Sequence, residues 1–161
     1  MTIPFNANEI FEMAQEIERN GAKFYRSAAK KFPQFSSLFA ELAAMEDEHE
    51  KTFKKMQDEL AGPEVDPPVF DPDGEAEMYL QVMADEQVFD TRTDPSTLLD
   101  KNEAPGDVLR MTIGLEKDSI AFYVGLRESV SQKAGKDKID MIIRQEYGHI
   151  VTLSKKLSEI E

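Results

Sequence analysis

One pattern of residues occurs twice in this sequence, and the repetition limits the folds open to the chain. Each copy has a glutamate followed seven residues later by a tyrosine, and then a Glu-x-x-His motif. The residues are Glu18, Tyr25, Glu46 and His49 in the first half, and Glu116, Tyr123, Glu146 and His149 in the second. The first glutamates lie 98 positions apart (116 minus 18), and the second glutamates lie 100 apart (146 minus 46). This spacing indicates two structural units of the same kind.

Each copy of the pattern spans two long segments in which apolar residues recur with the period of an α-helix. The predicted helices cover about residues 8–31, 34–61, 105–130 and 137–160, and a shorter helix covers 75–89. Asn6 with Glu9 predicts a capping box, and Phe5 with Ile10 predicts a hydrophobic staple at the first helix. Asp137 is the predicted N-cap of the last helix.

The connections between these segments predict how the helices are arranged. Pro33 ends the first helix, and the segment 131–135 is a turn, so both of these connections are short and predict antiparallel neighbours. The connection 62–104 is long and too poor in apolar residues to fill a core of its own. We therefore predict an all-α protein, an antiparallel four-helix bundle with one long crossover, forming a single domain over residues 1–161.

The four repeated glutamates are expected to lie at one level of this bundle. Glu18 and Glu46 are equidistant from residue 32, and Glu116 and Glu146 are equidistant from residue 131. Because a helix rises about 1.5 Å per residue, each glutamate lies roughly 20 Å along its helix from the turn. In each Glu-x-x-His motif the two side chains share a helix face, and that face is the apolar one.

Six polar ligands in one core layer indicate a metal site. Four buried carboxylates cannot all stay ionised without cations, and two divalent metal ions supply the missing charge. The predicted ligands are Glu18, Glu46, His49, Glu116, Glu146 and His149. Oxygen-rich ligation with two imidazoles suits iron or manganese, and zinc remains an alternative. The competing interpretation of each histidine is a hydrogen-bonded polar group of the core.

The two tyrosines allow two interpretations. An aromatic residue on the inner face of a helix commonly packs in the core. Tyr25 and Tyr123 are alternatively hydrogen-bonded to a ligand glutamate. We assign both of them, with Glu46 and Glu146, to the candidate catalytic group.

Composition excludes several other classes of site and partner. The chain has no cysteine, which excludes disulfides, thiolate catalysis and iron–sulfur clusters within this sequence. A formal net charge of −13 argues against nucleic-acid binding, which needs clustered Lys and Arg. No apolar run is long enough to cross a bilayer. Residues 1–9 lack a signal-peptide pattern, so we expect a cytoplasmic protein.

The repeated motifs resemble those of the di-iron domain of rubrerythrins, within the ferritin-like group. The resemblance covers all four long helices. It implies that Glu18 and Glu116 are carboxylate ligands, that Glu46 and Glu146 bridge two iron ions, and that one histidine completes each end. It also implies that the reduced site reacts with hydrogen peroxide or dioxygen.

The chain departs from the rubrerythrin pattern at two places. Rubrerythrins usually carry a C-terminal rubredoxin domain, and a sequence without cysteine lacks one. Electrons would then come from a separate donor, such as a rubredoxin-like protein. Rubrerythrins also carry a further glutamate three residues after Glu116, where this chain has Ser119. The resemblance therefore implies one ligand fewer and an open position, and by analogy with the family we expect a homodimer.

Three functions remain open from the sequence. The first is a di-iron oxidoreductase that acts on peroxide or dioxygen. The second is an iron-binding or sequestration protein without redox turnover. The third is a metal-free helical interaction protein.

Overall fold

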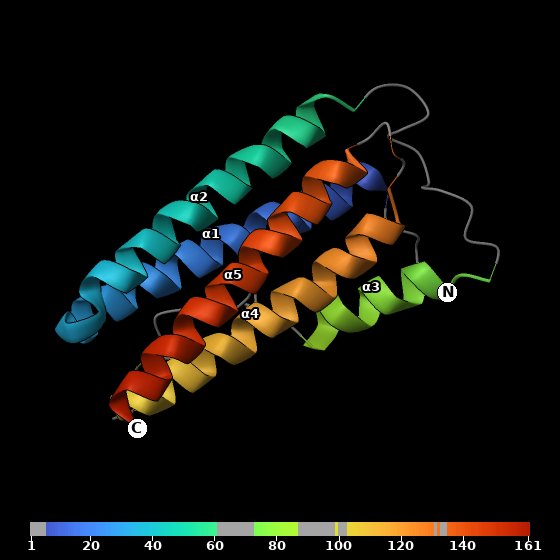
Figure 1. Ribbon diagram of the computed structural model, residues 1–161. Helices are drawn as coiled ribbons and strands as arrows, with labels where there is room; N and C mark the ends of the chain where they lie inside the picture. The colour runs from blue at the N-terminus through green and yellow to red at the C-terminus, as the bar shows by residue number, and fades with distance from the viewer. Residues whose placement is uncertain (1–5, 61–72, 87–98, 100–102, 131, 133–134) are drawn as a thin grey trace.

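In the computed structural model, the part of the chain that is described is built mainly of helices (Figure 1). It describes residues 6–60, 73–86, 99, 103–130, 132 and 135–161. The elements are α1 (Ala7–Lys31), the short 3₁₀ helix η1 (Pro33–Phe35), α2 (Ser36–Asp58), α3 (Glu75–Glu86), α4 (Pro105–Glu128) and α5 (Lys136–Ile160).

The four long helices form two antiparallel pairs. In Figure 1, α2 runs back along α1, and α5 runs back along α4. The two pairs pack together along their length, and α3 lies beside α4. The predicted all-α four-helix bundle is confirmed, and so is a short helix within the long crossover.

The start of α1 follows the predicted chemistry. The Asn6 side chain accepts a hydrogen bond from the Glu9 backbone N–H (2.9 Å), and the Glu9 carboxylate accepts one from the Asn6 N–H (3.0 Å). These two bonds form the predicted capping box. The staple residue Phe5 lies outside the described residues.

Three predicted helix ends differ from those in the structure. The second helix was expected from residue 34 to 61, but Pro33 starts a 3₁₀ turn and α2 covers only Ser36–Asp58. Proline favours the first position of such a turn because its missing N–H is not needed there. The third helix was expected to reach residue 130, but it ends at Glu128, where the Ser129 N–H bonds to the Leu126 carbonyl. Of the predicted helix 75–89, residues 87–89 lie outside the described part.

The N-cap of α5 also differs from the prediction. Gly135 occupies the cap with φ at +108°, a backbone conformation that residues other than glycine rarely adopt. Asp137 is the second residue of the helix and lies in its first turn. There its negative charge still interacts favourably with the partial positive charge of the helix N-terminus.

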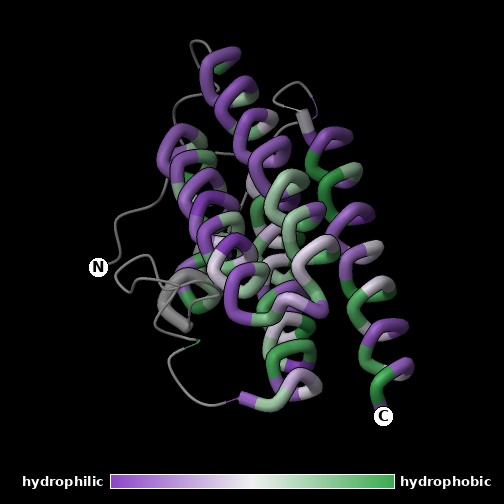
Figure 2. The backbone as a smooth tube through the Cα atoms, turned by 90° about the vertical axis from the view of Figure 1, so that its left-hand side faces the viewer, coloured by the Kyte–Doolittle hydropathy of each residue, from purple (hydrophilic) through white to green (hydrophobic). Residues whose placement is uncertain are grey.

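The core runs between the two helix pairs. Figure 2 shows polar and apolar residues alternating along the helices, as expected when each buries one face. Aromatic rings fill much of the interior: Phe11, Phe24, Phe39, Phe53 and Phe122 have no exposed surface. Within the described residues, no helix is both long and apolar enough to cross a membrane.

The helix α3 is held against the bundle by a close approach at Gly125. A Cβ atom on Gly125 would lie 2.5 Å from Cδ1 of the Tyr79 ring and 3.1 Å from Leu80. Tyr79 also donates a hydrogen bond from its hydroxyl to the Ala121 carbonyl (2.6 Å), and Leu80 is buried. The sequence left the place of this helix open, and the structure puts it on α4.

We expect Gly125→Ala to destabilise the protein relative to Gly114→Ala, a matched change in the same helix. Both variants gain similar helix propensity, but a Cβ at Gly114 meets no atom within 4 Å. The added methyl at Gly125 must displace Tyr79, and overpacking of this kind costs about 1–3 kcal/mol. Urea unfolding of both variants measures the difference in the free energy of unfolding. Equal values would contradict the packing of α3 described here.

Candidate metal centre

Six polar side chains from all four long helices meet in the interior of the bundle. Between 1% and 5% of the surface of each is exposed. The helix α1 supplies Glu18, α2 supplies Glu46 and His49, α4 supplies Glu116, and α5 supplies Glu146 and His149. The structure thus brings together the six residues that the sequence predicts as ligands.

The six residues form two overlapping groups, each able to hold a metal ion. One group is Glu18, Glu46, His49 and Glu146, and the other is Glu46, Glu116, Glu146 and His149. In each group one atom from every residue lies within 4.8 Å of the others. Two residues, Glu46 and Glu146, belong to both groups. Each group therefore has three carboxylates and one imidazole, and two of the carboxylates are shared.

Both histidines turn the same ring nitrogen toward the carboxylates. The Nδ1 atom of His49 lies 2.7 Å from Glu146 Oε1 and 3.5 Å from Glu18 Oε2. The Nδ1 atom of His149 lies 3.2 Å from Glu146 Oε2 and 3.4 Å from Glu46 Oε1. The two rings are 5.9 Å apart and nearly parallel. Both imidazoles thus present a potential ligand atom to the same central space.

The tyrosines connect the two helix pairs through the glutamates. The Tyr25 hydroxyl on α1 donates to Glu116 on α4, and the Tyr123 hydroxyl on α4 donates to Glu18 on α1. Their rings also pack in the core, Tyr25 against Phe39. Packing and hydrogen bonding, which the sequence posed as alternatives, therefore occur together. Each hydroxyl binds Oε1 and leaves Oε2 of the same glutamate facing the cluster.

Burial of so many carboxylates changes their proton affinities. Burial, followed by the negative charges of Glu46 and Glu146, raises the pKa of Glu18 well above its ordinary value. Burial and the charge of Glu146 raise the pKa of Glu116 to about 8. Burial also acts to raise the pKa values of Glu46 and Glu146, but close contacts with neighbouring groups, both histidines among them, outweigh it and lower both. The charge of the cluster is thus partly balanced by protons on Glu18 and Glu116.

The histidines balance the remaining negative charge. Burial alone would lower the pKa of His149, but the nearby carboxylates of Glu116, Glu146 and Glu46 raise it to about 12. The pKa of His49 is raised in the same way by Glu146, Glu18 and Glu46. Metal ions at the same place would replace these protons as the source of positive charge.

The chemistry of the unpaired atoms fits two divalent cations. Among the described residues, the buried atoms without a hydrogen-bond partner include Glu18 Oε2, Glu116 Oε2, both oxygens of Glu146 and Nδ1 of both histidines. Unpaired buried polar atoms are costly, and here they converge on one space. Carboxylate oxygens with imidazole nitrogens are suitable donors for iron, manganese or zinc.

Two nearby residues differ from what the motifs alone suggest. Gln145 was not predicted, yet its Oε1 lies 2.7 Å from Nε2 of His49. Its only signal in the sequence is its position directly before Glu146. Ser119 is buried, and its hydroxyl bonds to the Leu115 carbonyl of its own helix (3.1 Å).

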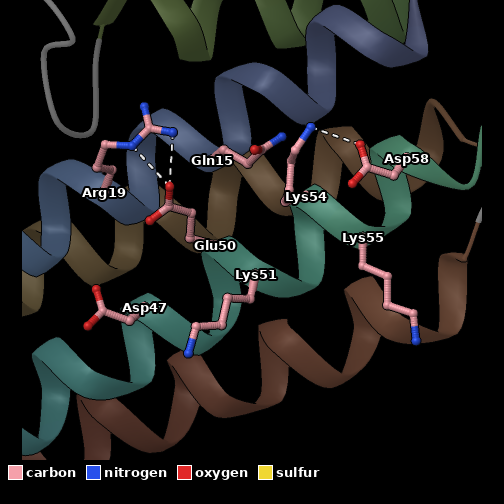
Figure 3. A pocket seen from close by; sticks show the side chains of 8 residues that line it. All are labelled: Gln15, Arg19, Asp47, Glu50, Lys51, Lys54, Lys55 and Asp58. Carbon is pink, nitrogen blue, oxygen red and sulfur yellow. Dashed lines mark hydrogen bonds and ion pairs between the residues drawn. The ribbon is translucent and has the colours of Figure 1, made fainter.

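A separate surface groove over α1 and α2 contains none of the six clustered residues. Figure 3 shows two ion pairs among its charged side chains, Arg19 with Glu50 (2.9 Å) and Lys54 with Asp58 (2.8 Å). These pairs are largely exposed, as on an ordinary solvated helix surface. The buried cluster is therefore the candidate functional site.

Known proteins match this chain in sequence family and in fold. The Rubrerythrin family model matches residues 9–158. The chain belongs to the rubrerythrin family. A crystal structure from Thermotoga maritima, of a protein assigned to the ferritin-like diiron-carboxylate proteins, is 26% identical to this rubrerythrin-family chain, covers 100% of both chains and gives a TM-score of 0.76. No curated protein matches the chain.

We expect chelator-treated protein to lose stability as the pH rises from about 5 to about 8. The raised pKa values of Glu18 and Glu116 keep protons on the folded chain above the unfolded glutamate pKa of about 4.3. Folding therefore binds protons in this range, and their stabilising effect is lost as the pH approaches the folded pKa, about 8 for Glu116. The raised pKa of His149 also lowers the stability as the pH rises, beginning at the unfolded histidine pKa of about 6.5.

Urea unfolding at several pH values, with and without added metal ion, tests this expectation. The lowered pKa values of Glu46 and Glu146 add no slope here, because their effect appears only at more acidic pH. Metal-loaded protein should gain stability over the same range, since metal ions compete with protons for the ligands. Chelator-treated protein that becomes more stable toward pH 8 would contradict the charge balance described above.

Proposed function

We propose that this rubrerythrin-family protein is a di-iron oxidoreductase that reduces hydrogen peroxide or dioxygen. The observation that carries the proposal is the pair of overlapping ligand groups with Glu46 and Glu146 in common. Two shared carboxylates suit bridging ligands between two metal ions, which is the arrangement of di-iron carboxylate bundles. The family match and the ferritin-like diiron-carboxylate relative support the same proposal.

In this proposal each residue of the cluster has a defined role. Glu46 and Glu146 would be shared by the two ions, Glu18 and Glu116 would each hold one ion from α1 and α4, and the histidines would offer Nδ1. Two ferrous ions in these positions would supply the two electrons that break the O–O bond of hydrogen peroxide, which with two protons gives two water molecules. The surrounding aromatic core excludes bulk water from this chemistry.

The tyrosines position the carboxylates that do not bridge. Burial and the neighbouring glutamate charges raise the pKa of Tyr25 and Tyr123 well above 10, so both hydroxyls keep their protons and donate them in hydrogen bonds. Each bond fixes one oxygen of Glu116 or Glu18 and orients the other toward the centre. A ligand held in this way needs little rearrangement when a metal ion binds.

Electrons for repeated turnover come from outside the sequence in this proposal. The chain has no cysteine to hold a rubredoxin-type iron. A separate donor, such as a rubredoxin-like protein, would reduce the site after each reaction. A homodimer and a cytoplasmic location remain predictions of the same kind.

Protein purified without chelator is expected to contain about two metal ions per chain, mostly iron. Glu146→Gln should reduce the content to below about one, because this side chain belongs to both ligand groups. Glu48→Gln is the matched control, because it makes the same chemical change at an exposed glutamate that pairs with exposed Lys51. Elemental analysis measures both variants. Metal-free wild-type protein would instead favour a helical interaction protein.

When the protein is loaded with Fe²⁺ without oxygen, about one hydrogen peroxide molecule should oxidise each two bound iron ions. Tyr25→Phe keeps the ring but loses the hydrogen bond to Glu116, so we expect oxidation to slow by about tenfold or more. Tyr147→Phe, which changes an exposed tyrosine, is the control and should have no effect. Stopped-flow absorbance of the ferric product measures the rate. Bound iron that peroxide leaves ferrous would support iron binding without turnover.

A further inference from the structure

The outer nitrogen of His49 has a hydrogen-bond partner on another helix. Gln145, on α5, places its amide oxygen 2.7 Å from Nε2 of His49, on α2. An amide oxygen only accepts hydrogen bonds, so Nε2 carries the proton in this contact. In the neutral ring the lone pair is then on Nδ1, the atom that faces Glu146 and Glu18. Gln145 thus favours the form of His49 that binds a metal ion through Nδ1.

The second histidine lacks this support. His149 turns Nδ1 toward the carboxylates in the same way, but its Nε2 is buried with no hydrogen-bond partner in the part of the chain that the structure describes. The repeat explains the difference. Gln145 directly precedes Glu146, whereas Met45 directly precedes Glu46. A methionine sulfur is only a weak hydrogen-bond acceptor.

The other residues of the two ligand groups are of the same types and have the same types of partner. Both groups contain Glu46 and Glu146, and the glutamate unique to each accepts a tyrosine hydroxyl. Ser119 adds no donor to its side of the cluster, because its hydroxyl bonds to its own helix. Among the hydrogen bonds of the described residues, the contact at the outer histidine nitrogen distinguishes the two positions.

We propose that Gln145 is a positioning residue that makes the two metal positions unequal. The position formed by Glu18, Glu46, His49 and Glu146 binds a divalent cation more tightly than the position that contains His149. Outer hydrogen bonds to metal-binding histidines typically change affinity by 10–100-fold, because they orient the ring and fix its tautomer. This inference rests on the proposed function, in which both groups bind metal ions.

Titration of chelator-treated protein with Co²⁺ tests the inference without any measurement of activity. Visible absorption follows binding, and a competing chelator sets the free Co²⁺ concentration. Wild-type protein should bind two ions in two steps whose affinities differ about tenfold or more. Gln145→Leu should weaken the tighter step about tenfold and bring the two affinities together. Gln145 is exposed, so this change leaves the core intact, and circular dichroism checks the fold.

Two further variants separate positioning from a general structural effect. Gln145→Glu keeps an acceptor oxygen beside Nε2 and should preserve two distinct steps. Met45→Gln places an amide at the repeat-related position and should strengthen the weaker step while the tighter step stays unchanged. A loss of packing would weaken both steps and could not produce this gain.

The outcomes distinguish this inference from the proposed function. If wild-type protein binds no Co²⁺, both are wrong. If it binds two ions with equal affinity, or if Gln145→Leu leaves two distinct steps unchanged, the inference about Gln145 is wrong and the metal centre stands. Convergence of the two affinities in Gln145→Leu, with separation kept in Gln145→Glu, supports it.

Discussion

Burial of four carboxylates at one level of a helical bundle is the constraint on which the rest of this structure depends. Charged groups in an apolar interior are unfavourable unless opposite charges or hydrogen bonds compensate them. The cluster uses both kinds of compensation, because two imidazoles contact the carboxylates and two phenols donate to Glu18 and Glu116. These partners come from different helices, so satisfying the glutamates also fixes how the α1–α2 pair sits against the α4–α5 pair.

The same constraint explains the aromatic character of the core next to the cluster. A phenol that reaches a buried glutamate needs its ring to be held firmly, and Phe39 and Phe53 pack against Tyr25 and Tyr123. Apolar packing on both sides of the polar layer excludes water, which strengthens each electrostatic contact inside it. The aromatic layers thus hold in place the side chains that satisfy the buried glutamates.

The sequence predicts the bundle and its six clustered residues because both leave a regular trace. Helical period marks which residues face inward, and Glu-x-x-His spacing places two ligands on one of those faces. Local hydrogen bonding is predictable where a side-chain motif marks it, as in the Asn6–Glu9 capping box. The 3₁₀ turn at Pro33 and the N-cap at Gly135 are formed by backbone groups without such a motif, so the sequence did not predict them. The position of α3 depends on the fit of Tyr79 over Gly125, which is a contact between segments and carries no periodicity. The sequence did not predict the role of Gln145 for a related reason. A polar residue at an exposed helix position normally contacts only water, so nothing in the pattern indicates its contact with His49.

The repeat keeps the buried charged residues and their tyrosine partners in both halves, and it differs at several positions beside them. Glutamates, histidines and tyrosines are all matched between the halves, since loss of any one would leave a buried partner unpaired. Positions beside them carry no such penalty: Ser119 corresponds to Gly21, and Gln145 corresponds to Met45. A duplicated unit can therefore change at its edges while its ionic centre stays the same. Differences between two chemically similar metal positions would arise at these neighbouring residues. The fold tolerates substitution there, and the new side chain still contacts the ligands, as Gln145 contacts His49.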